Sequence, residues 1–132
     1  MTCSGCSSRA ADSNYPVWRA LSLTRGDSFE MTVRVLSEGV PVTLGADGRV
    51  YWQFSKTDGS DLLRKVFTGT SQDGEGYVTL SLLPGDTADI SPGCYEYEIE
   101  FCVSPDELVI TAVRGVAEIS GDIITPDERA AQ

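Results

Sequence analysis

The stretch "CYEYEIEFCV", residues 94–103, alternates apolar and acidic side chains through its central part. Successive side chains of a β-strand point to opposite faces of a sheet, so this period of two predicts a strand with one face in a core and the other in solvent. The predicted core face carries Tyr95, Tyr97, Ile99, Phe101 and Val103, and the predicted solvent face carries Glu96, Glu98 and Glu100. This segment alone favours an all-β fold.

The same alternation continues on both sides of this segment. It predicts further strands over residues 17–24, 28–37, 49–57, 62–68, 77–83 and 107–120. Gly115 interrupts the last of them, which predicts a bulge or a bend at that point. Residues 84–90 offer at most one helical turn.

Turn signals separate the predicted strands. Asp-Gly pairs, which are typical of β-hairpins, lie at residues 47–48, 58–59 and 73–74. Together these patterns predict a single immunoglobulin-like β-sandwich of about seven antiparallel strands.

The 132 residues fit one domain. The β pattern covers residues 16–124, which we predict to form the sandwich. The small polar residues 1–15 predict a flexible N-terminal arm, and residues 125–132 predict a short C-terminal tail.

The composition narrows the classes of function. The formal net charge is −10, and no basic stripe offers itself to phosphates, so we expect no nucleic-acid partner. The chain has no histidine, which excludes Ser-His and Cys-His nucleophilic pairs and histidine metal sites. No apolar run approaches the roughly 20 residues of a membrane span, and the N-terminus shows no secretory signal. We therefore expect synthesis in a cytoplasm and no membrane partner.

The tripeptide Arg25-Gly26-Asp27 matches the sequence that animal integrins recognise. It lies between two predicted strands, where glycine gives the backbone freedom to turn and aspartate supplies a local hydrogen bond. An integrin ligand also needs an extracellular destination, for which the chain shows no signal. We therefore predict that these residues form a hairpin turn.

The four cysteines fall into two pairs. Cys3 and Cys6 form a C-x-x-C in the predicted arm, a spacing found in redox pairs and in zinc sites. Cys94 and Cys102 lie on one predicted strand about 26 Å apart, at 3.3 Å per residue, and so cannot share a metal ion. We expect inert cysteines and no cofactor; a disulfide between subunits and a metal site are the alternatives.

Carboxylates also come in pairs at the predicted turns: Asp58 with Asp61, Asp73 with Glu75, and Asp86 with Asp89. A glycosidase needs two carboxylates at a fixed separation across a cleft, and a calcium site needs several converging oxygens. No calcium-loop spacing is present, so we interpret these acids as solvated turns. We predict no catalytic residue and no metal ligand.

Two features suit contact with another protein. Glu96, Glu98 and Glu100 form an acidic ladder with about 6.6 Å between neighbours, which is either a solvated face or a docking surface for a basic partner. Trp18, near the start of the first strand, suits a core or an interface. The candidate interface residues are Trp18 and the three glutamates, together with Cys3 and Cys6 of the predicted arm.

Several motifs occur in an order that resembles a known family. They are "RGDSFEMTVRV", a "G-x-P-x-x-L" bend at residues 39–44, the strand "VTLSL" at 78–82, an Asp-Thr turn, and "P-G-x-Y-x-Y-x-I" at 92–99. Over about residues 20–124 the chain resembles the small immunoglobulin-like domains of tailed-bacteriophage virion proteins. These include the N-terminal domain of the baseplate upper protein family and related stand-alone tail or head proteins.

The resemblance implies a virion structural protein with no catalytic residues. Its partners would be other virion proteins and further copies of itself. A tail or baseplate location is the first expectation; a capsid decoration protein and a host-surface carbohydrate-binding module are the alternatives. The corner that leads into strand F of immunoglobulin sandwiches implies that the hydroxyl of Tyr95 or Tyr97 bonds back to the upstream backbone.

Overall fold

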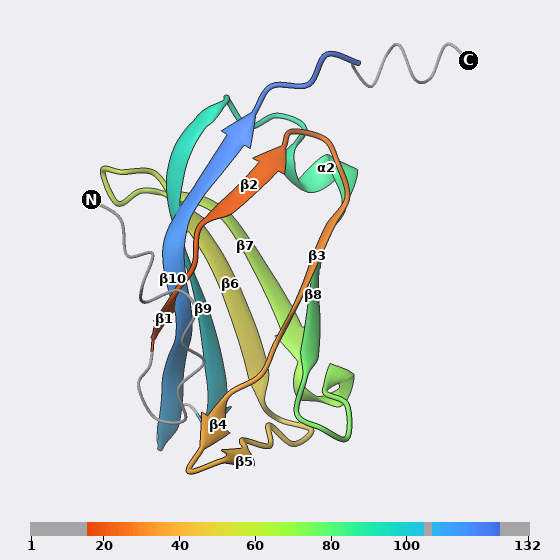
Figure 1. Ribbon diagram of the computed structural model, residues 1–132, viewed down its shortest axis with the longest axis vertical. Coiled ribbons are helices and arrows are strands. Elements are labelled where there is room, and N and C mark those ends of the chain that lie inside the picture. The colour runs from red at the N-terminus through yellow and green to blue at the C-terminus, as the bar shows by residue number, and fades with distance from the viewer. Residues whose placement is uncertain (1–15, 105–106, 125–132) are drawn as a thin grey trace.

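The computed structural model describes residues 16–104 and 107–124, which form a two-sheet β-sandwich (Figure 1). The larger sheet has the strand order β1-β10-β9-β6-β7, and β2 also pairs with β10. The bounds of these strands are β1 (Val17–Trp18), β10 (Leu108–Ser120), β9 (Gly93–Ser104), β6 (Arg49–Ser55), β7 (Asp61–Thr68) and β2 (Leu21–Thr24). The neighbours among β10, β9, β6 and β7 run antiparallel.

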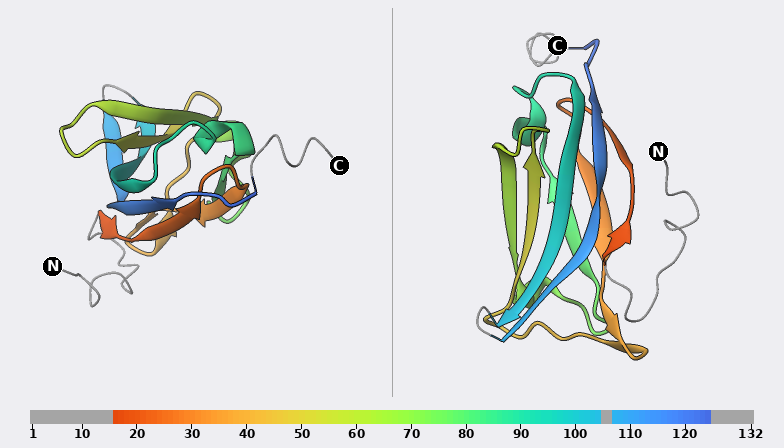
Figure 2. Two further views of the ribbon diagram at one scale, coloured as in Figure 1. Left: turned by 90° about the horizontal axis from the view of Figure 1, so that it is seen from above. Right: turned by 90° about the vertical axis from the view of Figure 1, so that its left-hand side faces the viewer.

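The smaller sheet pairs β3 (Phe29–Val33) with β8 (Val78–Leu82). A separate short hairpin is formed by β4 (Leu36–Ser37) and β5 (Val40–Pro41). The 3-10 turn η1 (Gly69–Ser71) follows β7, and the predicted helical turn is α2 (Pro84–Thr87), directly after β8. The larger sheet curves, so that β7 and β2 lie on different sides of the interior (Figure 2).

The core lies between the inner faces of the two sheets. Trp52 and Phe54 of β6, Ile99 and Phe101 of β9, and Leu80 of β8 are fully buried. Trp52 lies directly beside Ile99 in the β6–β9 register. Burying one such side chain stabilises the fold by about 1.5–3 kcal/mol. Of the predicted core face of residues 94–103, Tyr97, Ile99 and Phe101 are buried, whereas Tyr95 and Val103 are half-buried. The predicted all-β sandwich is confirmed.

The strand order matches that of an immunoglobulin-like sandwich. β10, β9, β6 and β7 take the places of strands G, F, C and C′, and β3 and β8 take those of B and E. Trp52 is buried on β6, the strand at the position of strand C, where immunoglobulin domains also carry a buried tryptophan. Tyr97 stands on strand F where antibody domains place the second cysteine of their disulfide.

The prediction that all strands run antiparallel is wrong at the N-terminal edge. Residues 17–24 divide into β1 and β2, and both pair with β10 in parallel. Hairpins force neighbouring strands to be antiparallel, but no turn joins β1 or β2 to β10, so their direction is free. The predicted strand 28–37 also divides, into β3 and β4.

The sequence predicted a bulge or a bend at Gly115, and the structure shows no bulge there. This residue continues the regular β9–β10 pairing, whereas the register shifts lie between Leu108 and Val109 and between Thr111 and Val113. A Cβ atom at position 115 would lie 1.9 Å from the carbonyl oxygen of Arg19, which belongs to the link between β1 and β2. Glycine is therefore required here for the close approach of a second backbone.

Asp-Gly pairs also proved less specific than expected. Asp58-Gly59 closes the hairpin between β6 and β7, with Gly59 at a φ of 90°. The pairs at 47–48 and 73–74 precede β6 and β8 instead. Because β5 and β6, like β7 and β8, belong to different sheets, these turns cross between sheets and do not form hairpins.

Candidate interaction surface

The acidic ladder lies on the side of the larger sheet that faces away from the smaller sheet. Glu96 is exposed, and Glu98 and Glu100 are half-buried. β9 has β6 on one side and β10 on the other, so each acid has cross-strand neighbours. We call this surface the outer face; it is formed by Tyr51, Gln53, Ser55, Arg64, Val66, Glu96, Glu98, Glu100, Arg114 and Val116.

Charges of both signs alternate across the middle of the outer face. Glu98 lies between Gln53 of β6 and Arg114 of β10. Arg64 of β7 donates a hydrogen bond from Nε to Gln53 Oε1 at 2.9 Å, and Thr111 donates from Oγ1 to Glu98 Oε2 at 3.1 Å. The acidic ladder on β9 is thus part of a surface of mixed charge, with Arg64 on one side of it and Arg114 on the other.

Apolar groups are exposed among these charges. Val66 of β7 is 50% exposed, and Val116 of β10 and Trp18 of β1 are about a third exposed. Trp18 lies beside Arg114 in the β1–β10 register, so it extends the outer face by one strand. The Arg64 guanidinium lies 5.4 Å from the centre of the Tyr51 ring and covers part of that ring.

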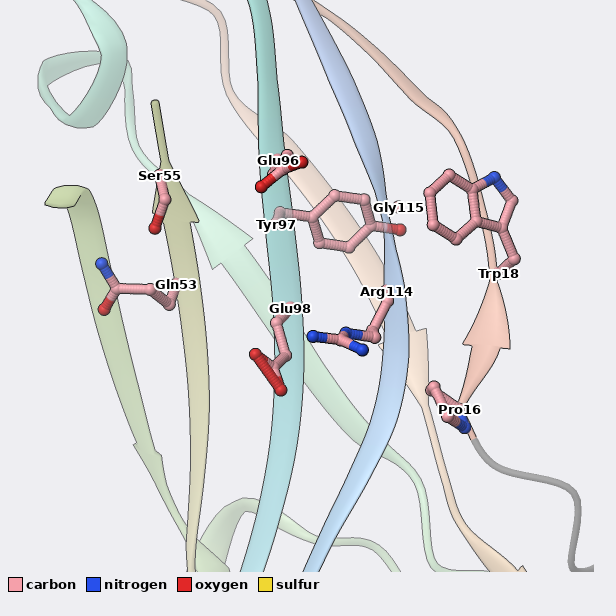
Figure 3. A pocket seen from close by; sticks show the side chains of 9 residues that line it. All are labelled: Pro16, Trp18, Gln53, Ser55, Glu96, Tyr97, Glu98, Arg114 and Gly115. Atoms are coloured by element: carbon pink, nitrogen blue, oxygen red, sulfur yellow. The ribbon is translucent and has the colours of Figure 1, made fainter. Parts of the chain in front are cut away.

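A hollow of about 350 Å³ opens on the outer face beside Trp18 (Figure 3). The Arg114 side chain extends from β10 toward Glu98, and Trp18 lies on the other side of β10 (Figure 3). The residues that line the hollow are Pro16, Trp18, Gln53, Ser55, Glu96, Tyr97, Glu98, Arg114 and Gly115. The hollow therefore combines an indole ring with carboxylates, an amide and a guanidinium.

Arg114 and Gln53 were not identified from the sequence. The alternation of their own strands does place both on a solvent face, so part of the signal was present. Their position beside Glu98 depends on the register between strands, and β10 shifts that register between Thr111 and Val113. A shift of this kind leaves no clear mark in a sequence.

The two tyrosines considered for the strand F corner have different partners. Tyr95 donates its hydroxyl hydrogen to the carbonyl oxygen of Ser91, four residues upstream, which is the bond of a tyrosine corner. Tyr97 donates to the carbonyl oxygen of Arg19 at 2.7 Å. Tyr95 therefore fixes a loop, and Tyr97 fixes the link between β1 and β2.

The environment of Tyr97 favours its neutral form. Burial raises the pKa of Tyr97 to about 12, against a smaller opposing effect of the Arg19 charge. The hydroxyl group is thus protonated at neutral pH and is available as a donor to Arg19.

The Arg25-Gly26-Asp27 segment is a turn, but it does not close a hairpin. Asp27 donates its amide to the Thr24 carbonyl at 3.1 Å, and Gly26 has a φ of 83°, which favours glycine. Gly26 also donates its amide to Thr87 Oγ1 at 2.8 Å. The prediction of a hairpin is wrong because the turn carries the chain from β2 in the larger sheet to β3 in the smaller one.

Arg25 is engaged within the protein. Its Nη2 lies 3.0 Å from Asp122 Oδ1, its Nε donates to the same oxygen, and its Nη1 donates to the Ile90 carbonyl at 3.3 Å. The guanidinium that an integrin would need to contact is half-buried in these interactions. The Arg25–Asp122 pair anchors the segment that follows β10.

Acids in the turns accept local hydrogen bonds. Asp58 accepts from the amide and the hydroxyl of Ser60, and the amide bond is the main cause of its lowered pKa. Asp73 accepts from the amides of Glu75 and Tyr77, both at 2.9 Å. These carboxylates stabilise turns, in keeping with the interpretation from the sequence.

Asp86 has a different role, because it joins the two sheets. Its Oδ2 accepts the Leu83 amide at 2.7 Å at the start of α2, and the Lys65 ammonium of β7 at 2.9 Å. Burial opposes ionisation of Asp86, but the bonds from Lys65 and Leu83 outweigh it and lower its pKa.

The two cysteines of β9 are free: Cys94 is exposed and Cys102 is buried. Cys3 and Cys6 lie outside the described residues. Within residues 16–104 and 107–124, no three or more His, Cys, Asp or Glu side chains gather in a way that could hold a metal ion.

Comparisons with protein-family models and with curated proteins find no match for this chain. Among the helices of the described segments, none has the length and apolar character needed to cross a membrane. The outer face is therefore the main guide to function.

Proposed function

We propose that this protein is a non-enzymatic structural subunit of a bacteriophage particle. It would assemble in the tail or baseplate region through the outer face and the terminal segments. The observation that carries this proposal is the outer face, where Trp18, Val66 and Val116 are exposed among charges of both signs. Aromatic residues and arginine are enriched in protein interfaces, and complementary charges fix the register of a partner.

The assignment to a phage particle rests on the resemblance of residues 20–124 to virion domains. The immunoglobulin-like strand order and the Tyr95 corner are compatible with that resemblance. The partners would be other virion proteins and further copies of this chain. Its location would be the virion.

The direct test is quantitative mass spectrometry of phage particles released from cells that carry the gene. We expect the protein in purified particles at the low copy number of a tail structure. Hundreds of copies per particle would favour the head decoration alternative. Absence from particles would contradict the proposal.

A charge reversal tests whether the outer face makes the contact. Arg114→Glu changes an exposed side chain at the centre of this face, and we expect it to prevent incorporation into particles. Glu30→Lys is the matched control, because Glu30 is an exposed residue of β3 in the other sheet. Both variants should remain folded, since surface substitutions usually change stability by less than about 0.5 kcal/mol. Equal incorporation of both variants would exclude the outer face as the contact.

The hollow beside Trp18 favours a second candidate, a carbohydrate-binding module. Ligand pockets commonly combine apolar or aromatic walls with a few orienting polar groups, and here Trp18 lies near Glu96 and Glu98. Binding on a glycan array that is lost in Trp18→Ala would support this candidate. A silent array would count against it.

A further inference from the structure

One row of residues crosses five strands of the larger sheet on the outer face. We call it the central row; from β7 to β1 its members are Arg64, Gln53, Glu98, Arg114 and Trp18, each beside the next in the strand register. Neighbouring strands lie about 4.8 Å apart. A carboxylate and a guanidinium therefore lie on adjacent strands near the middle of the face.

The two charges at the middle of this row have bonding capacity left. Glu98 accepts the Thr111 hydroxyl on Oε2 at 3.1 Å. Arg114 is exposed and extends toward Glu98 (Figure 3). Within residues 16–104 and 107–124, neither Glu98 nor Arg114 takes part in an ion pair. Both can therefore bond a group of opposite charge on another molecule.

The outer face is less acidic than the chain as a whole. The chain has a formal net charge of −10, but the outer face carries three glutamates against two arginines, a net charge of −1. The other −9 lies elsewhere in the sequence. Two copies that meet through their outer faces keep most of their like charge apart, whereas contact through another surface brings acidic groups together.

The order of charges in the central row selects one way to pair two outer faces. A two-fold axis parallel to the strands, between β9 and β10, lays β9 of each copy on β10 of the other. Glu98 of each copy then faces Arg114 of the other copy, so the favourable pair occurs twice. An axis between β6 and β9 lays Arg64 on Arg114, and an axis along the central row lays Glu98 on Glu98. Both of these bring like charges together.

The hollow beside Trp18 fits the same axis. Packed sheets lie about 10 Å apart and cross at about 30°, so the match is best at a single row. β1 of each copy faces β6 of the other, which lays Trp18 over Gln53. Both residues line the hollow of about 350 Å³, so the indole of each copy enters the hollow of the other. Tryptophan and arginine are the side chains that most often dominate interface energies.

We propose that two copies of this chain form a two-fold dimer through their outer faces, with the axis between β9 and β10. Reciprocal pairs of Glu98 and Arg114 fix the register, and Trp18 of each copy occupies the hollow of the other. The interface is isologous, because the same surface serves both subunits. This inference rests on the proposed assembly role and names one partner for the outer face.

The test is a mixing experiment with two full-chain variants, Glu98→Arg and Arg114→Glu. Alone, each variant meets its own copy with two like-charge pairs, so we expect its dimer to be weaker than that of the wild type by about tenfold or more. In an equal mixture, arginines of one variant face glutamates of the other, and a mixed dimer should form. Light scattering should show twice the 14.2 kDa monomer mass for the wild type and for the mixture. Native mass spectrometry identifies the mixed species.

A second mixture controls for net charge. Glu30→Arg changes the charge of the chain as much as Glu98→Arg does, but Glu30 is an exposed residue of β3 in the smaller sheet. Alone, Glu30→Arg should dimerise like the wild type. Mixed with Arg114→Glu, it should form few mixed dimers, because one of the two reciprocal pairs stays repulsive. Circular dichroism checks that every variant is folded.

Several results would overturn the proposal. A wild type that is monomeric at every concentration does so without the use of any variant. The other contradicting results are a mixture of Glu98→Arg with Arg114→Glu that stays monomeric, and either variant alone dimerising as well as the wild type. Incorporation into particles that depends on Arg114, despite a monomeric wild type, would assign the outer face to a different virion protein.

The proposed function can fail or hold separately, because it is tested by presence in particles. A protein that is found in particles but is monomeric in solution would retain the function and lose this contact. A dimer with the expected mixing behaviour that is absent from particles would retain the contact and lose the function.

Discussion

The two long sides of the sandwich are closed in different ways. On the closed side, where β1 and β2 meet β10, backbone and side chains of the N-terminal strands are tied down by Tyr97, Gly115 and Asp122. On the open side, where β7 and β8 lie, the ion pair between Lys65 and Asp86 joins the sheets. The closed side shows how the chain's own N-terminal residues complete a sheet. On the open side, the described part of the chain gives the smaller sheet two strands, β3 and β8.

This difference predicts unequal contributions to stability. Residues on the closed side make contacts that the isolated chain already satisfies, so substitutions there should reduce stability. Apolar residues on the open side, such as Leu63 and Phe67 of β7, are only half-buried among the described residues, so substitutions there should reduce stability less. The following substitutions test that contrast.

The largest effect should come from truncating the covered core. Phe54→Ala leaves a cavity in fully buried surroundings and should lower the free energy of unfolding by about 3–5 kcal/mol. Phe67→Ala, on the half-buried inner face of β7, should cost about half as much. Urea denaturation of both variants measures the difference. Equal losses would mean that β7 is covered as completely as β6.

Gly115→Ala should have the next largest effect. The added Cβ meets the Arg19 carbonyl on the closed side, and overpacking of this kind costs about 1–3 kcal/mol. Gly74→Ala is the matched control, because nothing lies within 4 Å of a Cβ there. The same denaturation experiment should show little change for Gly74→Ala. A neutral Gly115→Ala would contradict the requirement for a glycine.

Tyr97→Phe removes the hydroxyl that holds Arg19. A lost hydrogen bond of this kind costs about 0.5–1.5 kcal/mol, whereas Tyr51→Phe on the outer face should be nearly neutral. The pKa of Tyr97 is raised from 10.0 to about 12. The contribution of the protonated Tyr97 hydroxyl to the free energy of unfolding is therefore complete below pH 10 and is lost as the pH rises through 12. Between pH 9 and about 12, the free energy of unfolding should fall less steeply with rising pH for Tyr97→Phe than for wild type.

The smallest effect is expected on the open side. Asp86→Asn removes the charge that accepts from Lys65 and from the Leu83 amide, and should cost about 1 kcal/mol or less. The pKa of Asp86 is lowered from 3.8, so its contribution is present above pH 3.8 and is lost as the pH falls through the lowered value. The free energy of unfolding, measured as the pH is lowered, should therefore change less for Asp86→Asn than for wild type. An identical acid profile would show that the ion pair does not stabilise the fold.

Features with a short-range pattern could be predicted from the sequence. The period of two in residues 94–103 identified β9, its buried Ile99 and its outward-facing glutamates. Tyr95 and its carbonyl partner are four residues apart, so the corner also has a local signal. The sandwich class follows from such repeated local signals.

Long-range features could not be predicted in the same way. The need for glycine at position 115 comes from Arg19, and the anchoring of Arg25 comes from Asp122; both partners are distant in sequence. The shift between Thr111 and Val113 set which residues flank Glu98. These contacts depend on how separate strands meet, which the residues of one strand do not encode.

The most direct measurement is the solution mass of the purified full chain by light scattering after size exclusion, over a range of concentrations and with and without reductant. A structural subunit that assembles through non-covalent contacts should exceed the 14.2 kDa monomer mass as concentration rises, and reductant should not change this. A monomer at every concentration would contradict self-assembly. A dimer that reductant dissolves would show that cysteines join the subunits instead.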